Sequence, residues 1–172
     1  VFKGIVGVYW YMRLRGHEID SVDFGRKSFG QQYALGNKTS DVHELSRLLM
    51  KLSEKTGRRM RSAGYDAQGV HLWLNFENRM YWAKGKKLSH PVYSTQDIFA
   101  AAQRLLYSVA IPARVTNMGV TVFDLRPSNP EQLGLFDDGR LSTTGLAKAA
   151  DMVNDRYGEF TLVPALMANM QD

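Results

Sequence analysis

The chain has 172 residues, 44% of them apolar and 23% charged, which is the balance of a globular domain and excludes a disordered chain. Cysteine is absent, which excludes disulfides and thiolate chemistry and suits a reducing cytoplasm. The four histidines lack metal-ligand spacing, and no apolar run is long enough to span a membrane. The net charge of +5 is uneven: residues 25–115 hold 15 Lys/Arg against 6 Asp/Glu, and residues 116–172 hold 4 against 8. A basic body of this kind favours a polyanionic partner.

Two segments precede the regular part of the sequence. Residues 4–15, GIVGVYWYMRLR, predict a helix that ends at Gly16 and is apolar nearly all round. Such a helix needs a partner to cover it, which indicates a piece of something larger. Residues 17–26, HEIDSVDFGR, are polar and have no period, which is typical of a linker.

A regular pattern begins with residues 27–35, KSFGQQYAL, whose alternation of apolar and polar residues predicts a strand. Asp41 and Glu44 then have the spacing of a capping box. The helix that they introduce carries leucines at core spacing and closes near Gly64.

Residues 70–76, VHLWLNF, and residues 79–87, RMYWAKGKK, predict two strands joined by a tight turn. Ser94 and Thr95 are candidate N-caps of a second helix, Pro112 closes that helix, and residues 114–125 predict a final strand. The order β-α-β-β-α-β is that of the split βαβ or ferredoxin-like arrangement, an α+β fold with a four-stranded antiparallel sheet. Both helices must cover the same sheet face, which leaves the other face open.

Polar and basic side chains are expected to line that open face. The candidates for phosphate contacts are Arg26, Lys27, Ser28, Lys84, Lys86, Arg114, Asn117 and Thr121. Charge alone leaves two interpretations, a nucleic-acid surface or a solvated strand face. A second basic row is interpreted as the solvated side of the first helix, and it consists of Arg47, Lys51, Lys55 and Arg58.

Aromatic residues of the two middle strands also have two interpretations. Parity predicts that Tyr81 points into the core, whereas Trp73 and Trp82 are either packing residues or stacking platforms for single-stranded bases. The sequence shows no phosphate loop, no Ser/His/Asp arrangement and no carboxylate pair placed for a metal. The chain by itself is therefore not expected to be an enzyme.

Several segments match one family in their order along the chain: LRG at 14–16, KSFGQQYAL, AKGKK at 83–87, RVTNMGVTVFDL and QLGLF at 132–136. Together they resemble the C-terminal part of a Y-family translesion DNA polymerase, of the bacterial DNA polymerase IV or mutagenesis-protein kind. The resemblance implies an error-prone polymerase that acts in damage tolerance. Its palm domain, with the carboxylates that bind magnesium, has no counterpart here. The chain would be a non-catalytic part that binds primer–template duplex and has no cofactor of its own.

The resemblance also implies a division of the chain. Its parts are the end of a thumb domain (1–16), a tether (17–26), a little finger DNA-binding domain (27–126), a clamp-binding segment (127–138) and a C-terminal extension (139–172). Within the extension, residues 145–158 predict a short helix and residues 159–166 a strand or an extended arm. No role is assigned to the extension.

Carried over residue by residue, the family's DNA contacts fall on Arg26, Lys27 and Ser28 at the start of the first strand and on Lys84 and Lys86 in the third. Gln31 stands where other members can have a basic or imidazole group. Members often have Arg just before the Gly-Val of the last strand, where this sequence has Thr116-Asn117-Met118. That phosphate contact is then weaker, or is made by Arg114.

In this family a pentapeptide of the Gln-Leu-x-Leu-Phe type docks on the ring-shaped sliding clamp. Here Gln132 would be the polar anchor, and the apolar plugs would be Leu133, Leu135 and Phe136. In the alternative, the three apolar residues fold back onto the domain as a lid.

Two other functions compete with the polymerase interpretation. The first is a β-α-β-β-α-β RNA-binding module, which predicts an aromatic-rich K/R-G-F-G/A-F-V motif on the third strand. Residues 79–87 have RMYWAKGKK instead, which argues against it. The second is a protein-interaction domain whose basic residues are incidental.

Overall fold

The computed structural model describes residues 4–18, 25–128 and 138–168. Its elements are α1 (Ile5–Leu14), β1 (Ser28–Thr39), α2 (Val42–Ser62), β2 (Tyr65–Phe76), β3 (Tyr81–Val92), α3 (Thr95–Leu106), β4 (Val115–Pro127), α4 (Asp138–Tyr157) and the 3-10 helix η1 (Ala165–Met167). The α+β class and the predicted β-α-β-β-α-β order, from β1 to β4, are confirmed. None of the helices in the described ranges has both the length and the apolarity needed to cross a bilayer.

The four strands form one sheet in the order β1-β4-β2-β3, and every neighbouring pair is antiparallel. The crossover from β1 through α2 to β2 passes over β4, and the crossover from β3 through α3 to β4 passes over β2. Each βαβ unit is therefore split by one strand of the other unit. As a result β2 and β4 occupy the centre of the sheet, and β1 and β3 are its edges.

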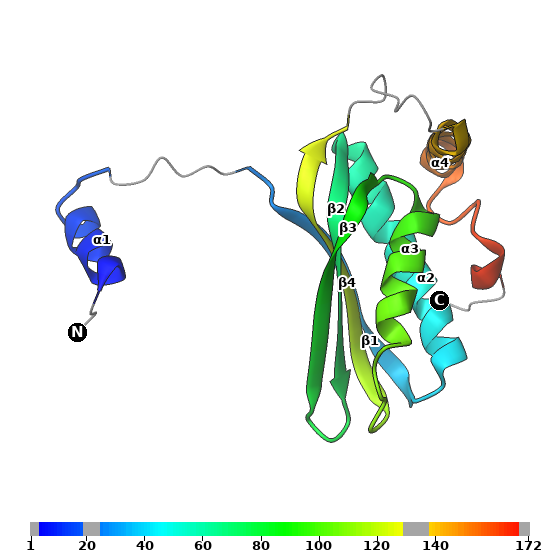
Figure 1. Ribbon diagram of the computed structural model, residues 1–172, viewed down its shortest axis with the longest axis horizontal. Helices are drawn as coiled ribbons and strands as arrows, with labels where there is room; N and C mark the ends of the chain where they lie inside the picture. Colours follow the sequence, from blue (N-terminus) through cyan, green and yellow to red (C-terminus); the bar gives the residue numbers. More distant parts are fainter. Residues whose placement is uncertain (1–3, 19–24, 129–137, 169–172) are drawn as a thin grey trace.

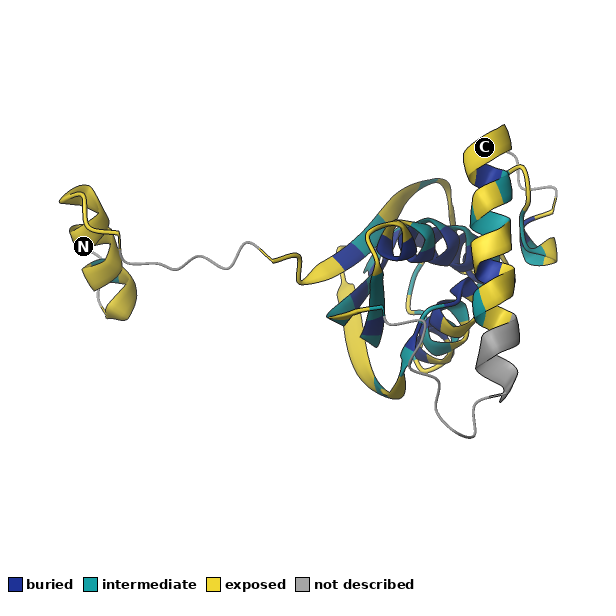
Figure 2. Ribbon diagram, turned by 90° about the horizontal axis from the view of Figure 1, so that it is seen from above, coloured by how far each residue is buried: buried dark blue, intermediate teal, exposed yellow. Residues whose placement is uncertain are grey.

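Helices α2 and α3 lie side by side on one face of the sheet (Figure 1). In β2 the residues at 70, 72, 74 and 76 are buried, whereas those between them are half-buried, so alternate side chains point toward the helices. The fully buried core residues from this side of the sheet and from the two helices include Val70, Leu72, Leu74, Met118, Val120, Val122, Leu45, Leu49, Ile98 and Leu106. Figure 2 shows these buried positions concentrated between the sheet and the helix pair.

Side-chain caps begin both core helices. The Asp41 carboxylate accepts a hydrogen bond of 2.8 Å from the His43 amide at the start of α2. At the start of α3, the Ser94 hydroxyl accepts from the Asp97 amide at 3.1 Å and donates to the Asp97 carboxylate at 2.7 Å. Asp41 and Ser94 are therefore confirmed as N-caps, each satisfying an amide that has no partner within the helix. The capping box with Glu44 is not formed, because the Asp41 amide donates to the Thr39 hydroxyl at 3.1 Å, and Thr95 is the first residue of α3 and not its cap.

The C-terminal extension adds a third layer outside α2 (Figure 1). The helix predicted for 145–158 is confirmed as the end of α4, which closes at Gly158 with a φ of 113°. The Asn154 side chain, which is 2% exposed, then donates to the Leu162 carbonyl and accepts from the Leu162 amide. This pair of bonds turns the chain back along α2, and of the predicted segment 159–166, residues 159–164 form an irregular arm and the last two begin η1, so that no strand is present there.

One buried hydroxyl in α2 is left without a hydrogen-bond partner among the described residues, Oγ1 of Thr56. Because an unsatisfied buried polar group costs desolvation energy, we expect Thr56→Val to raise the free energy of unfolding by about 1 kcal/mol. Urea denaturation measures the change. Ser53→Ala is the control, because the equally buried Ser53 hydroxyl donates to the Leu49 carbonyl at 2.8 Å and its removal should destabilise. A loss of stability in both variants would contradict the prediction.

Candidate nucleic-acid interface

Helices α2 and α3 pack on one face of the sheet, and the opposite face has no helix packed on it within the described residues. Directly paired residues in antiparallel strands point to the same face, so the register defines this surface as four rows across β1, β4, β2 and β3. The rows are Ser28-Phe123-Gly69-Lys87, Gly30-Thr121-His71-Gly85, Gln32-Gly119-Trp73-Ala83 and Ala34-Asn117-Asn75-Tyr81. We call these residues the open face.

The open face carries almost no charge. Lys87 is the one Lys, Arg, Asp or Glu in the four rows, and the other positions hold amides, hydroxyls, aromatic rings, a histidine and small residues. The predicted contacts Ser28, Asn117 and Thr121 do lie on this surface. The expectation of a face lined with basic groups is nevertheless wrong.

The main difference from the prediction concerns Lys84 and Lys86, which were expected on the open face. They pair with Leu72 and Val70, whose side chains point to the helices, so both lysines lie on the helix side of β3. They remain exposed because β3 is an edge strand. Gln31 pairs with Val120 and likewise lies on the helix side, at the opposite edge.

The aromatic residues of the β2–β3 hairpin also differ from the prediction in the sheet face on which they lie. Tyr81, expected in the core, is 61% exposed on the open face, with its ring centroid 6.4 Å from that of Trp73. Trp82 lies on the helix side and packs against the core cluster. The sequence pattern gives Trp73 and Trp82 the same two interpretations, whereas the strand register places Trp73 on the open face and Trp82 on the helix side.

Two glycines allow aromatic rings to lie close to the strand backbone. A Cβ atom at Gly119 would come within 2.4 Å of the Trp73 indole, and a Cβ atom at Gly69 would come within 2.4 Å of the Phe123 ring. Both separations are shorter than real carbon contacts, so the rings occupy the space that a larger residue would fill. Because Gly119 and Gly69 have no side chains, nothing projects from these two positions beside the rings of Trp73 and Phe123.

Cationic side chains surround the open face instead of covering it. We call this set the basic rim: all its members are exposed, and within the described residues none is in a salt bridge. It comprises Arg26, Lys27, Arg79, Lys84, Lys86, Arg114 and Arg126. Arg26 and Lys27 precede β1, while Arg79 and Arg114 lie at the other end of the strands, where the Arg114 carbonyl accepts from the Glu77 amide. The prediction from sequence did not include Arg79 and Arg126, because turn and strand-end cations have no periodic signal.

The one charged residue of the open face is paired. Nζ of Lys87 lies 2.9 Å from Oδ2 of Asp124, and this hydrogen bond is the main reason why the pKa of the Asp124 carboxyl is lowered. Partial desolvation works in the opposite direction, and the charges of Lys87 and Arg126 add to the lowering. The pair therefore stabilises the fold fully above the ordinary aspartate pKa of about 3.9, and this contribution is lost as the pH falls through the lowered value.

An NMR titration of the Asp124 carboxyl tests this pairing. We expect a midpoint below that of an unperturbed aspartate, and Lys87→Met should move the midpoint up toward the ordinary value. Lys84→Met is the matched control, because Lys84 is on the opposite side of the same strand and should leave the midpoint unchanged. An unchanged midpoint in Lys87→Met would contradict the pairing.

The basic row on α2 is not a solvated face, contrary to the prediction. Arg58 bonds Asp155 at 2.6 Å, Lys55 lies 3.8 Å from Glu159, and Arg47 donates to the carbonyls of Leu166 and Ala168. The ammonium groups of Lys51 and Lys55 also lie 5.6 and 5.0 Å from the centroid of the Phe160 ring. The C-terminal extension thus covers most of this row.

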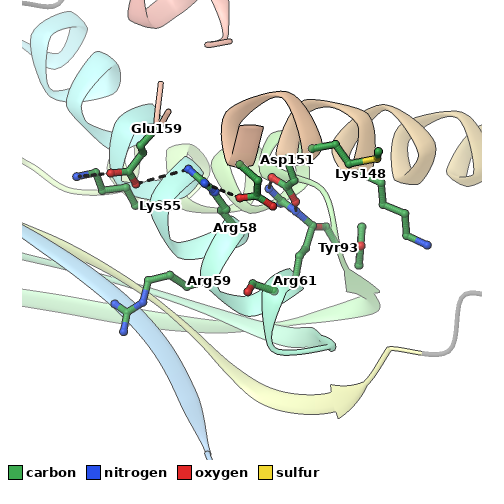
Figure 3. A pocket seen from close by; sticks show the side chains of 11 residues that line it. Lys55, Arg58, Arg59, Arg61, Tyr93, Lys148, Asp151 and Glu159 are labelled. Atoms are coloured by element: carbon green, nitrogen blue, oxygen red, sulfur yellow. Dashed lines mark hydrogen bonds and ion pairs between the residues drawn. The ribbon is translucent and has the colours of Figure 1, made fainter. Parts of the chain in front are cut away.

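Arg61, further along α2, also contacts the C-terminal extension, and its side chain is buried. Its guanidinium donates two bonds to Asp151, of 2.6 and 2.8 Å, and its remaining donor nitrogen lies 3.2 Å from both the Tyr93 carbonyl and the Thr95 hydroxyl. Burial raises the pKa of the nearby Tyr93 hydroxyl, against the opposing effect of the Arg61 charge. Figure 3 shows the chain of ion pairs that joins α2 to α4 and to Glu159 across the pocket between them. Asp151, Asp155 and Glu159 thus take up the charges of Lys55, Arg58 and Arg61, whereas Lys148 also lines the pocket and has no salt bridge among the described residues.

Within the described ranges, no group of three His, Asp or Glu side chains is arranged to hold a metal ion. The clamp-binding residues Gln132, Leu133, Leu135 and Phe136 lie outside the described residues.

Comparison with known proteins places these features in a family. The profile of the impB/mucB/samB family C-terminal domain matches residues 26–135. DNA polymerase IV of Moorella thermoacetica is 30% identical over 166 residues, covering 91% of this chain, and that of Pelotomaculum thermopropionicum is 27% identical over 168 residues, covering 95%. The chain spans only 40% and 42% of those relatives.

Solved structures show the same fold. A Y-family DNA polymerase chimera superimposes with a TM-score of 0.59 at 20% identity, and DinB from Sulfolobus solfataricus with a TM-score of 0.51 at 19% identity. Each match covers 72% of this chain and 36% of the other. The resemblance found in the sequence is confirmed at the level of the family: the chain belongs to the impB/mucB/samB family, whose C-terminal domain it matches.

Proposed function

We propose that residues 27–126 are a little finger domain that holds primer–template duplex DNA for an error-prone translesion polymerase acting in the bacterial cytoplasm. In this proposal α1 is the end of a thumb domain, and residues 17–26 are the tether to the little finger. Nucleotide transfer and its magnesium ions would belong to the parts of the polymerase that correspond to the remaining length of the relatives. The described part of this chain would bind the duplex and hold it in position.

The observation that carries this proposal is the open face within its basic rim, in a chain whose curated relatives are DNA polymerases. Rim cations at both ends of the strands can contact phosphates, and the hydroxyl and amide groups of Ser28, Thr121 and Asn117 can add hydrogen bonds from within. Phosphate contacts of this type position a duplex without reading its sequence. A protein-interaction surface does not require unpaired cations around its edge.

Salt-dependent binding to a blunt duplex tests the proposal. Each phosphate contact lowers the slope of log K against log salt by about 0.9. Arg79→Ala/Arg114→Ala should therefore weaken binding on all sequences alike and reduce the magnitude of the slope by roughly 1 to 2. Lys148→Ala is the matched control, because Lys148 is an exposed cation on α4, outside the sheet.

Each outcome of that titration decides between interpretations. A variant slope equal to that of the unmodified chain would remove the rim from the interface. A loss of binding in Lys148→Ala as large as in the double variant would mean that only net charge matters. A preference for single-stranded RNA over duplex DNA would favour the RNA-binding interpretation.

We further propose that residues 132–136 bind a bacterial sliding clamp. The support is the Gln-Leu-x-Leu-Phe pattern together with a family profile that extends through residue 135. A few large apolar anchors can supply most of the affinity of an extended peptide. Binding of the chain to a purified clamp should be abolished by Leu135→Ala/Phe136→Ala, and the duplex affinity should not change. Equal clamp binding by both proteins would refute this assignment.

A further inference from the structure

The proposed duplex contacts are the rim cations with Ser28, Thr121 and Asn117, and they do not include the aromatic pair at the hairpin end of the open face, Trp73 and Tyr81. Trp73 and Tyr81 lie on neighbouring strands with ring centroids 6.4 Å apart and ring planes inclined by 34°. Tyr81 is 61% exposed, so it gains little from burial in this position. An exposed tyrosine that does not contribute to the core needs another explanation.

The indole of Trp73 is half-buried, and its cross-strand neighbours leave the rest of the ring uncovered. Its direct cross-strand neighbours are Gly119 and Ala83, the smallest residues that a strand can offer. A Cβ at Gly119 would already lie within 2.4 Å of the indole. The ring therefore rests on the β4 backbone, and neither cross-strand neighbour has a side chain large enough to cover it.

Charge around the pair indicates the class of ligand. Arg79 follows the end of β2 and Arg114 precedes β4, both exposed at this end of the sheet. Glu77 is the acidic residue close to them, and Lys38 neutralises it at 2.9 Å. An aromatic surface next to unpaired arginines suits a nucleotide, whose base stacks on a ring while its phosphate meets a cation.

We propose that Trp73 and Tyr81 form a stacking platform for an unpaired base of single-stranded DNA, next to the duplex that the open face holds. The proposal extends the proposed function, because it names a second DNA element for the same surface. Stacking of this kind does not depend on the identity of the base, since every base presents a flat π face. The platform would hold a strand where it leaves the duplex.

Three DNA probes test the platform with the complete chain. They are a blunt duplex, the same duplex with a 5′ single-stranded overhang, and that overhang with abasic sites in place of its bases. We expect the base-containing overhang to bind roughly tenfold tighter than the other two. Tyr81→Ala and Trp73→Leu should each remove most of this gain and change blunt-duplex affinity far less, because neither side chain is among the proposed phosphate contacts.

Two controls separate stacking from folding and charge. Tyr81→Phe retains the ring and should keep the gain, whereas Met80→Ala changes an exposed neighbour without a ring and should also keep it. Quenching of tryptophan fluorescence by the overhang should disappear in Trp73→Leu, in which Trp82 and Trp10 remain. Circular dichroism verifies that the variants fold.

The failures of the two proposals can be told apart. Equal binding of all three probes by the unmodified chain would overturn the platform and leave duplex binding in place. Binding of the base-containing overhang alone, with no binding of the blunt duplex or of the abasic overhang, would support the platform and overturn the little finger function. No binding to any probe would overturn both.

Discussion

Replacement of Asp151 by alanine is expected to lower the free energy of unfolding by about 3–5 kcal/mol, because it leaves a buried guanidinium without its counter-charge. The Arg61 side chain is 3% exposed and that of Asp151 is 16% exposed. After the substitution Arg61 would keep only two neutral acceptors, the Tyr93 carbonyl and the Thr95 hydroxyl. Neutral hydrogen bonds compensate only part of the desolvation of a cation.

Asp155→Ala is the matched control for this prediction. Asp155 is one turn further along α4 and bonds Arg58 at 2.6 Å, but its side chain is 69% exposed. Exposed ion pairs are worth about 0.2–1 kcal/mol, so the same change should cost several times less here. Urea denaturation compares the two variants, and hydrogen exchange shows whether α4 alone opens. Equal costs for both variants would mean that Arg61 reaches water when Asp151 is removed.

Leu72→Ala is expected to lower the free energy of unfolding by about 2–5 kcal/mol, the range for a leucine truncated in a packed core. Leu72 is fully buried in the central strand β2, between Val120 of β4 and Lys84 of β3, on the side that faces the helices. Strands on both sides hold the backbone at this position, which limits how far the site can collapse into the cavity. Most of the loss should therefore remain uncompensated.

Leu146→Ala makes the same chemical change on α4, where the side chain is 62% exposed. Its cost should stay within about 0.5 kcal/mol, as is usual for surface positions. The two variants measured side by side in urea separate burial from residue type. A Leu72→Ala cost near that of Leu146→Ala would show that the sheet is not packed by α2 and α3 as described.

Local sequence signals predicted the parts of the fold that depend on local interactions. Asp41 and Ser94 cap the helices that they were predicted to cap, and the alternation in β2 placed its buried face correctly. In β3 the same argument was wrong for Tyr81. A shift of one residue in register exchanges the two faces of a strand, and an edge strand such as β3 has few buried residues to fix that register.

Contacts between distant segments were beyond local pattern analysis. The solvated interpretation of the α2 row was wrong because the acids that cover it are about a hundred residues further along the chain. A signal did exist: Asp151, Asp155 and Glu159 repeat every four residues, the spacing of one face of a helix. That acidic row matches the basic row of α2 in period and opposes it in sign.

The Arg61–Asp151 pair also has a consequence for the evolution of the family. Arg61 is buried against a carboxylate that the extension supplies, so we expect this arginine and the extension to be kept or lost together among homologues. Homologues that end soon after the sheet should therefore carry a neutral or apolar residue at the equivalent of position 61. Homologues with the extension should vary at 61 and 151 together, so that the two positions are inherited as one unit.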